Sequence, residues 1–251
     1  MAKDERVDIL GVKVSIINDS NVIDHIIELV TKKRQIQITT PNAEQILMAG
    51  KNEQFRRVIN QSDLAIPDGM SIVRVIRNRV KNKSLVSRVT GVDLVVKLCE
   101  LASQKKWKIG LMGASKEVRE KTVINLNRKF RKLEVVFLKS HQNVKKSKIE
   151  DGEILKDINK NKIDILLVAY GAPEQELWIN QNLKKTQVRI GMGVGGAFDF
   201  LSGKIKRAPG WWQKNGLEWL WRLIQEPWRI KRQIKLINFW WKIMRDDNLR
   251  I

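Results

Sequence analysis

An aspartate that directly follows a short apolar run is the residue of this sequence best placed to act as a base. Leu64 to Ile66 read as a buried strand, and Pro67 ends it because proline has no amide hydrogen to donate to a neighbouring strand. Asp68 and Gly69 then form a tight turn before a helix. A carboxylate at the carboxyl end of a strand in an open α/β sheet faces the crevice where such sheets bind ligands. Asp68 is therefore a candidate general base, and capping the following helix is the alternative role.

Two glycine-rich turns follow predicted strands. They run from Gly110 to Ser115, through Gly113, and from Gly191 to Gly196, through Gly195. Glycine lets backbone amides approach a phosphate closely, and a helix that begins after the turn favours negative charge. The second turn fits G-x-G-x-x-G but comes late in the chain, which argues against a dinucleotide fingerprint. A bound nucleotide diphosphate is one interpretation of these turns, and close packing of strand on helix is the other.

Further polar residues lie at the ends of other predicted strands. Ile163 to Tyr170 is almost continuously apolar, as in a central strand, and Glu174-Gln175-Glu176 opens the helix that follows. These side chains either contact a polar ligand or complement the helix dipole. Asp199, between two phenylalanines, either accepts hydrogen bonds from a base or sugar or caps a helix.

The acidic and metal-binding residue types do not indicate a metal site. The thirteen aspartates include no Asp-x-Asp, the pair with which many enzymes hold a divalent cation on a diphosphate, and the two histidines lie far apart. The charge of a departing diphosphate must then be met by arginines, lysines or backbone amides. The candidates are Arg88, Arg222, Arg229 and Arg232, and the spacing of the last three places them on roughly one side of a continuous helix.

The elements that must position these residues alternate between strand and helix. From Trp107 to Gly193, strand patterns are separated by helical runs, and a strand from Gln35 to Thr40 precedes the strand before Asp68. This order predicts an α/β fold with a largely parallel, open, Rossmann-like sheet covered by helices on both faces. The single cysteine, Cys99, lies in an apolar helical run, so we expect it to be buried in a protein of a reducing compartment.

The composition changes near Lys204, which divides the chain into an α/β core, residues 1–203, and a basic, tryptophan-rich helical appendage, residues 204–251. The whole chain has a formal charge of +21, which predicts an anionic partner, and seven of its nine tryptophans lie in the appendage. Ile230, Ile234, Ile237, Trp241 and Met244 form one apolar stripe along the last predicted helix. The stripe either lies in the headgroup region of an anionic membrane or docks on the core with lysines outside. A homo-oligomer that forms through the apolar faces is a further alternative. Nucleic acid is the less favoured partner, because no nucleic-acid motif accompanies the charge.

Several segments together resemble the WecG/TagA/CpsF glycosyltransferases, glycosyltransferase family 26, roughly from Val7 to Gln233. The resemblance rests on the following blocks in this order: Thr39 to Gln45, Ala65 to Gly69, Arg88 to Gly91, Gly110 to Ser115, Gly171 to Trp178, Gly195 to Asp199, Lys206 to Pro209, Leu217 to Trp219 and Gln225 to Pro227.

The resemblance implies a metal-independent bacterial enzyme, peripheral on the cytoplasmic face of the membrane, that transfers a sugar from a UDP-sugar donor to a polyprenyl-diphosphate-linked acceptor. In the branch that looks nearest, N-acetylmannosamine joins the C4 hydroxyl of N-acetylglucosamine on undecaprenyl diphosphate, with inversion, in wall teichoic acid synthesis. UDP-N-acetylmannosaminuronic acid and UDP-glucose are the alternative donors.

The resemblance also implies roles for individual residues. Asp68 would be the general base, and Arg88 would bind phosphate. The sugar and acceptor site would be lined by Thr40, Asn42 and Gln175, and Asp199 would help to hold the uridine. The site would be closed from the appendage by Arg222, Arg229 and Arg232. An aspartate with its usual pKa of ~4 is ionised at neutral pH, as a general base must be.

Overall fold

A parallel sheet forms the centre of the protein, whose computed structural model describes residues 5–138, 140, 151–214, 216–227 and 230–246. Its six strands lie in the order β4-β3-β8-β7-β5-β6, and every pairing is parallel. The strands are β3 (Ile36–Thr39), β4 (Leu64–Ala65), β5 (Lys108–Gly113), β6 (Glu134–Phe137), β7 (Ile165–Ala169) and β8 (Ile190–Gly193). The predicted parallel α/β fold is confirmed.

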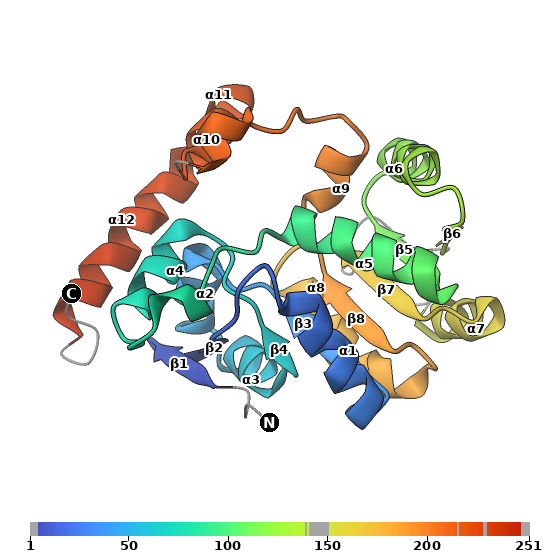
Figure 1. The fold of residues 1–251 in the computed structure, drawn as a ribbon, viewed down its shortest axis with the longest axis horizontal. Helices are drawn as coiled ribbons and strands as arrows, with labels where there is room; N and C mark the ends of the chain where they lie inside the picture. The colour runs from blue at the N-terminus through green and yellow to red at the C-terminus, as the bar shows by residue number, and fades with distance from the viewer. Residues whose placement is uncertain (1–4, 139, 141–150, 215, 228–229, 247–251) are drawn as a thin grey trace.

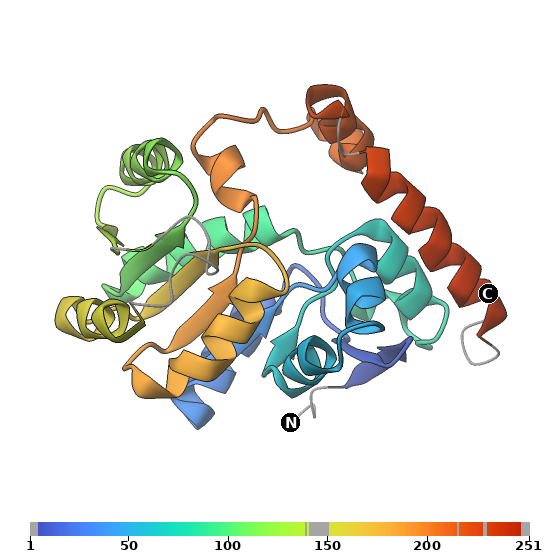
Figure 2. The same cartoon turned by 180° about the vertical axis from the view of Figure 1, so that it is seen from behind.

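Helices cover both faces of the sheet (Figures 1 and 2). Successive residues of a strand point to opposite faces, so Ile165 and Leu167 of β7 pack with α1, α5 and α6, whereas Leu166 and Val168 pack with α7 and α8. These helices are α1 (Val22–Lys33), α5 (Gly91–Lys105), α6 (Lys116–Lys129), α7 (Asp151–Asn161) and α8 (Glu174–Asn182). Burial on both faces explains why the sequence of β7 is continuously apolar.

A second apolar cluster joins one end of the sheet to the N-terminal hairpin. The antiparallel strands β1 (Arg6–Ile9) and β2 (Val12–Ser15) pack with α2 (Ala43–Ala49), α3 (Glu53–Gln61) and α4 (Met70–Arg77). Ser15 accepts a hydrogen bond from the amide of Ala65 at 3.1 Å, which ties the hairpin to β4. This cluster supports the turn that carries Asp68, because α4 begins directly after it.

The N-termini of several helices are fixed by side-chain caps. Asn42 caps α2, Thr90 caps α5 and Ser115 caps α6, each by accepting a hydrogen bond from a backbone amide of the first turn. These caps fall where the chain leaves β3, enters α5 and leaves β5, so they fix loops at the carboxyl edge of the sheet. Short helices α9 (Ala197–Leu201), η1 (Lys83–Leu85) and η3 (Leu183–Lys185) complete the part before residue 204.

The described part of the appendage contains the α-helices α10 (Gly210–Lys214), α11 (Glu218–Gln225) and α12 (Ile230–Arg245). α12 runs beside α2 along one edge of the molecule (Figures 1 and 2), and Phe239 and Ile243 are fully buried in the cluster with α2, α3 and α4. Of the two alternatives for the apolar stripe, docking on the core is wrong. All five stripe residues are exposed, from Trp241 at 47% to Ile237 at 71%. α12 is therefore apolar on two sides, and the division of the chain at residue 204 remains a prediction.

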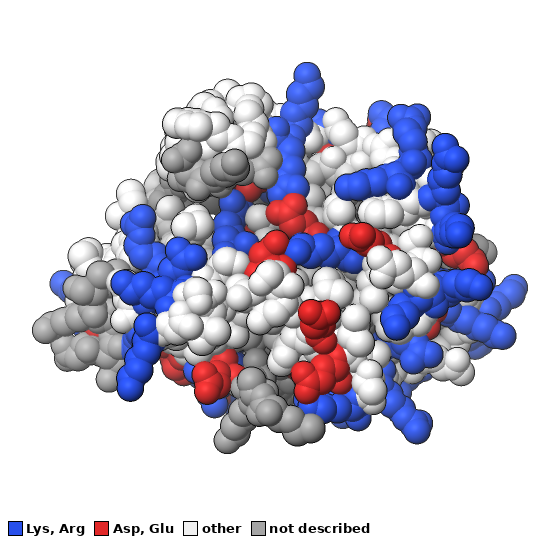
Figure 3. Space-filling view, viewed as in Figure 1, with Lys and Arg blue, Asp and Glu red and all other residues white. Residues whose placement is uncertain are grey.

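Exposed apolar side chains concentrate in the appendage. Of the eleven large hydrophobic residues exposed among those described, eight belong to it: Trp211, Trp219, Ile224, Ile230, Ile234, Ile237, Trp241 and Met244. In Figure 3 the bulge over α10 and α11 shows uncharged side chains, while lysines and arginines are densest over the end that carries α6. Among the described helices, none is both long and apolar enough to cross a bilayer.

Candidate active site

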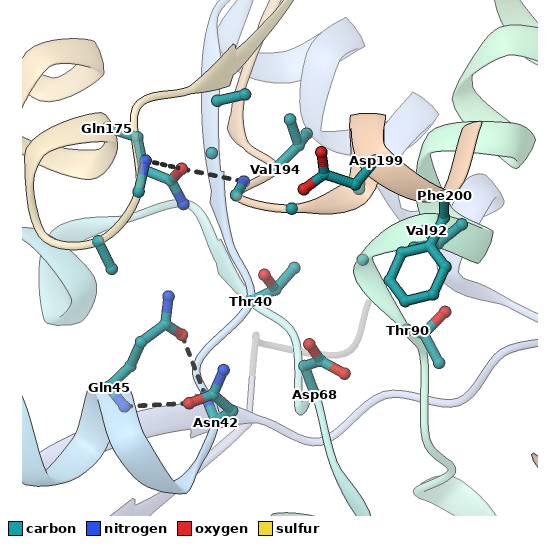
Figure 4. Close-up of a pocket in the computed structure, with 18 of the residues that line it drawn as sticks. Thr40, Asn42, Gln45, Asp68, Thr90, Val92, Gln175, Val194, Asp199 and Phe200 are labelled. Atoms are coloured by element: carbon teal, nitrogen blue, oxygen red, sulfur yellow. Dashed lines mark hydrogen bonds between the residues drawn. The ribbon is translucent and has the colours of Figure 1, made fainter. Parts of the chain in front are cut away.

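The loops at the carboxyl edge of the sheet enclose a cavity of about 580 Å³. Nine of the residues predicted from the sequence line it: Thr40, Asn42, Asp68, Arg88, Gln175, Gly195, Gly196, Asp199 and Arg222 (Figure 4 labels five of them). Gly113 lies next to two lining residues, Ala114 and Ser115. Arg229 and the side chain of Arg232 lie outside the described residues. The lining residues that follow the strands come together because parallel strands end at one edge of the sheet.

Asp68 presents a carboxylate with no hydrogen-bond partner among the residues that the structure describes. Its backbone amide donates to the carbonyl of Pro41 at 3.1 Å, and the amide of Ile66 donates to Thr39 at 2.8 Å, so the turn is fixed to the end of β3. α4 begins at Gly69 without a side-chain cap, so the alternative role of Asp68 as a helix cap is wrong. In Figure 4 its carboxylate faces the same space as Thr40, Thr90 and Asp199. The backbone is held while the acid is left for a ligand.

The pKa of Asp68 is raised to about 6. Burial is the main cause, because a charged carboxylate loses hydration there. The positive charges of Arg88 and Arg222 act in the opposite direction, while Glu218 and Asp93 raise the pKa further. Asp68 is thus more basic than the ordinary aspartate assumed from the sequence, and still mostly ionised at neutral pH.

Arg88 is held by an acid of the appendage. It donates to Glu218 on α11 at 2.6 Å, and both side chains are mostly buried. Arg207 lies 3.6 Å from the other oxygen of Glu218 and forms a two-fold hydrogen bond with Asp93 of α5. Arg88 Nε is buried without a hydrogen-bond partner among the described residues, so it keeps a donor for a ligand. These contacts join the appendage to the wall of the cavity.

Arg222 reaches the cavity from the same helix. It donates to Glu226 at 2.9 Å and lies over the ring of Phe200, 4.8 Å from its centre. A Cβ atom on Gly196 would lie 2.8 Å from an Arg222 nitrogen, so a larger residue there would displace this guanidinium. Arg222 therefore stands against the second glycine-rich turn, where a phosphate would meet both its guanidinium and backbone amides.

The glycine-rich turns also pack closely. A Cβ atom on Gly113 would lie 2.7 Å from the backbone of Ala169 on β7, and φ at Gly113 is +85°, a value that favours glycine. Close packing explains Gly113, whereas Ala114 and Ser115 after it face the cavity. Close packing is therefore confirmed at Gly113, while a nucleotide diphosphate near these turns stays a prediction.

Gln175 connects two of the loops around the cavity. Its Oε1 accepts hydrogen bonds from the amides of Gly171 at 3.1 Å and Gly195 at 3.0 Å (Figure 4), and its Nε2 donates to Glu176 at 2.7 Å. Glu176 itself is buried, and burial raises its pKa to about 7. Its second oxygen has no hydrogen-bond partner among the described residues. Gln175, itself held by Glu176, therefore keeps the loops after β7 and β8 at a fixed separation.

Asn42 combines a structural role with a free donor. Its Oδ1 accepts from the amide of Gln45, whose side chain accepts from the amide of Asn42, which is a complete capping box. The amide group of Asn42 is left to face the cavity, where it can donate to a sugar hydroxyl. Among the described residues, no three histidines, cysteines or acids gather in a way that could hold a metal ion.

Some pairings between residues of the site carry no signal in the sequence. Glu218 lies in a block that supports the resemblance, yet its partner Arg88 is 130 residues away, and no local pattern links them. Arg207 and Asp93 are likewise separated by 114 residues. Such pairs become visible only when the chain is folded.

The parallel sheet, the cavity at its carboxyl edge and the arginines beside a free carboxylate are features of an enzyme that acts on phosphorylated substrates. Residues 7–250 match the glycosyl transferase WecG/TagA/CpsF family. A Bacillus subtilis (strain 168) protein named N-acetylglucosaminyldiphosphoundecaprenol N-acetyl-beta-D-mannosaminyltransferase is 31% identical over 216 residues, which cover 84% of this chain and 79% of that protein. The chain belongs to the WecG/TagA/CpsF family of glycosyltransferases, and the match extends through the appendage.

Proposed function

We propose that this glycosyltransferase moves N-acetylmannosamine from UDP-N-acetylmannosamine to the C4 hydroxyl of N-acetylglucosamine on undecaprenyl diphosphate, with inversion. The name of the Bacillus subtilis relative supports the two sugars and the lipid diphosphate. One observation carries the chemistry: the unpartnered carboxylate of Asp68 shares a cavity with Arg88 and Arg222. UDP-N-acetylmannosaminuronic acid and UDP-glucose are the alternative donors.

In the proposed mechanism, Asp68 removes the proton of the acceptor hydroxyl as its oxygen bonds to the anomeric carbon of the donor. The bond from that carbon to the phosphate oxygen breaks, and its electron pair leaves with UDP. Arg88 and Arg222 stabilise the negative charge that develops on the diphosphate. A single displacement inverts the anomeric carbon, which requires the base and the leaving group on opposite sides of the sugar.

The other predicted residues are assigned by position. Thr40 and Asn42 follow the end of β3 and line the same part of the cavity as Asp68. We therefore place the acceptor sugar against them. Asp199 lies across the cavity next to Phe200, where we place the uridine. Gln175 acts by holding the loops that bear Gly171 and Gly195. Arg229 and Arg232 remain candidates for closing the site, and we expect no metal or other cofactor.

The appendage is proposed to bind the anionic cytoplasmic face of the membrane, where the acceptor lipid resides. Support comes from its eight exposed apolar residues and from its composition, with twelve lysines and arginines against four acids between Lys204 and Arg250. A homo-oligomer formed through the same apolar surface is the alternative. Sedimentation with and without anionic vesicles separates the two.

A panel of UDP-sugars tests the proposal. The purified chain is incubated with each donor and with N-acetylglucosamine linked through diphosphate to a short prenyl chain, without added metal, and products are resolved by mass. We expect one added N-acetylhexosamine from UDP-N-acetylmannosamine and much slower transfer from the other donors. Preferred transfer of a uronic acid or of glucose would replace the proposed donor, and no transfer from any donor would refute the proposal.

A further inference from the structure

A second cavity, of about 430 Å³, lies between α4 and the helices α11 and α12 of the appendage. It shares four lining residues with the first cavity: Asn42, Glu44, Asp68 and Trp219. Asp68 can therefore be reached from both sides. A transfer reaction needs such an arrangement, because donor and acceptor must approach one base from different directions.

Arg74 on α4 is a cation of the second cavity without a counter-charge. The residue lines this cavity, is exposed, and its side chain forms no hydrogen bond or ion pair with any residue that the structure describes. Glu44, an acid that also lines this cavity, is already bound to Lys235 of α12 at 2.7 Å. Arg77, one turn further along α4, is likewise engaged, with the carbonyl of Val86. Arg74 is thus free to bind an anionic group that enters the cavity.

The remaining wall of the second cavity is largely apolar. Met70 of α4, Leu217 and Trp219 next to and on α11, and Leu236 and Trp240 of α12 line it. Met70 and Trp219 are also exposed to solvent, so this wall continues to the surface beside the exposed residues of the appendage. An arginine among apolar side chains suits a ligand with a phosphate group attached to a hydrocarbon.

The spacing of Asp68 and Arg74 matches the chemistry of the acceptor. Arg74 is five residues beyond Gly69, roughly 7.5 Å along a helix that rises 1.5 Å per residue. The Cα–Cβ bonds of a helix tilt towards its N-terminus, which is the end of α4 that carries Asp68. A lipid-linked sugar carries its reacting hydroxyl and its diphosphate on opposite sides of one ring, so the two groups are about one sugar ring apart.

We propose that the second cavity binds the acceptor's diphosphate and the first prenyl units of its lipid, and that Arg74 is the residue that binds this diphosphate. The inference rests on the proposed function and adds to it a separate phosphate site: Arg88 and Arg222 bind the donor diphosphate in the first cavity, and Arg74 binds the acceptor diphosphate in the second. Asp68 lies between the two anions.

Kinetics with two acceptors test the role of Arg74. One acceptor carries N-acetylglucosamine on a short prenyl diphosphate, and the other carries the same sugar on an uncharged alkyl chain. We expect Arg74→Ala to raise the KM for the diphosphate acceptor roughly tenfold or more, the range for loss of a charged hydrogen bond, and to leave the KM for UDP-sugar and the rate with the alkyl acceptor unchanged. Arg74→Lys should recover part of the loss.

Arg79→Ala is the matched control, because Arg79 is exposed just beyond α4 and lines neither cavity. It should leave all these parameters unchanged. An equal loss of activity with both acceptors, a raised KM for the donor, or no change in Arg74→Ala would each overturn the inference.

Direct binding of farnesyl diphosphate separates this inference from the proposed function. By calorimetry, the wild-type and Arg79→Ala chains should bind it alike, and Arg74→Ala should bind several-fold more weakly. Binding that depends on Arg74, in a chain that transfers no sugar, would support the site and refute the proposed function. Transfer by a chain whose binding ignores Arg74 would overturn the site alone.

Discussion

Glu218 of the appendage accepts a hydrogen bond from Arg88 at 2.6 Å, and this contact links the C-terminal helices to the cavity that holds Asp68. The same carboxylate raises the pKa of Asp68, while Arg88 lowers it. A single acid of the appendage thus affects both the proposed phosphate ligand and the proposed base.

Replacing Glu218 with glutamine should alter both the position of Arg88 and the pKa of Asp68. Glu218→Gln keeps the shape but removes the charge, so Arg88 loses its ion pair and the pKa of Asp68 falls. We expect kcat/KM to drop by about tenfold, equivalent to ~1.4 kcal/mol of lost transition-state stabilisation, and the acidic limb of its pH profile to move to lower pH. Glu100→Gln, at an exposed position of α5, is the control and should change neither. An unchanged limb in Glu218→Gln would show that its charge does not reach Asp68.

The pH profile of the wild-type enzyme follows from the raised pKa. Asp68 acts as a base only when ionised, and its pKa is about 6, so kcat/KM should be flat above pH 7 and fall tenfold per pH unit well below pH 6. With an ordinary aspartate of pKa ~4, activity would stay nearly full down to about pH 5 and fall to half near pH 4. A limb near pH 4, measured where the chain stays folded, would contradict the burial of the base.

The exposed stripe of α12 should control membrane binding. A triple variant removes three apolar side chains that face away from the core: Ile234→Ser, Ile237→Ser and Trp241→Ser. Its sedimentation with anionic vesicles should fall sharply, while its circular dichroism spectrum stays the same. Ile124→Ser on α6, also an exposed isoleucine, should leave sedimentation unchanged. Undiminished sedimentation of the triple variant would assign membrane binding to another surface.

Glu176 should make stability depend on pH. Its pKa is raised from 4.5 to about 7, so the folded state binds the proton more tightly than the unfolded state does. The stability from this proton is complete below pH 4.5 and is lost as pH rises towards 7, by about 3 kcal/mol at most at roughly 1.4 kcal/mol per pKa unit. Urea unfolding between pH 5 and 8 should show that Glu176→Gln lacks this loss. Parallel curves for variant and wild type would exclude a buried, neutral Glu176.

Much of the fold and part of the site could be predicted from the sequence because their causes are local. The apolar run of β7 and the caps Asn42 and Thr90 act through neighbours in the chain, and Asp68 follows from a strand ended by Pro67. The parallel order of the strands places the predicted residues at one edge, so their meeting in one cavity could be predicted as well.

The rest depends on contacts between distant segments. The stripe on α12 has the clearest period, yet Phe239 and Ile243 on another side of the helix are the residues that dock, because the surface formed by α2, α3 and α4 decides which side fits. The pairing of Glu218 with Arg88 and the burial that raises the pKa of Asp68 arise in the same way. Neither leaves a periodic pattern in the sequence.

The activity of Asp68→Asn, measured together with UDP binding, tests the central claim most directly. Asparagine keeps the size and the turn but cannot accept the proton, so transfer should fall by roughly 10²–10⁴-fold, the usual contribution of a general base, while UDP binds as tightly as to the wild type. Near-normal turnover by a folded Asp68→Asn chain that still binds UDP would contradict the account.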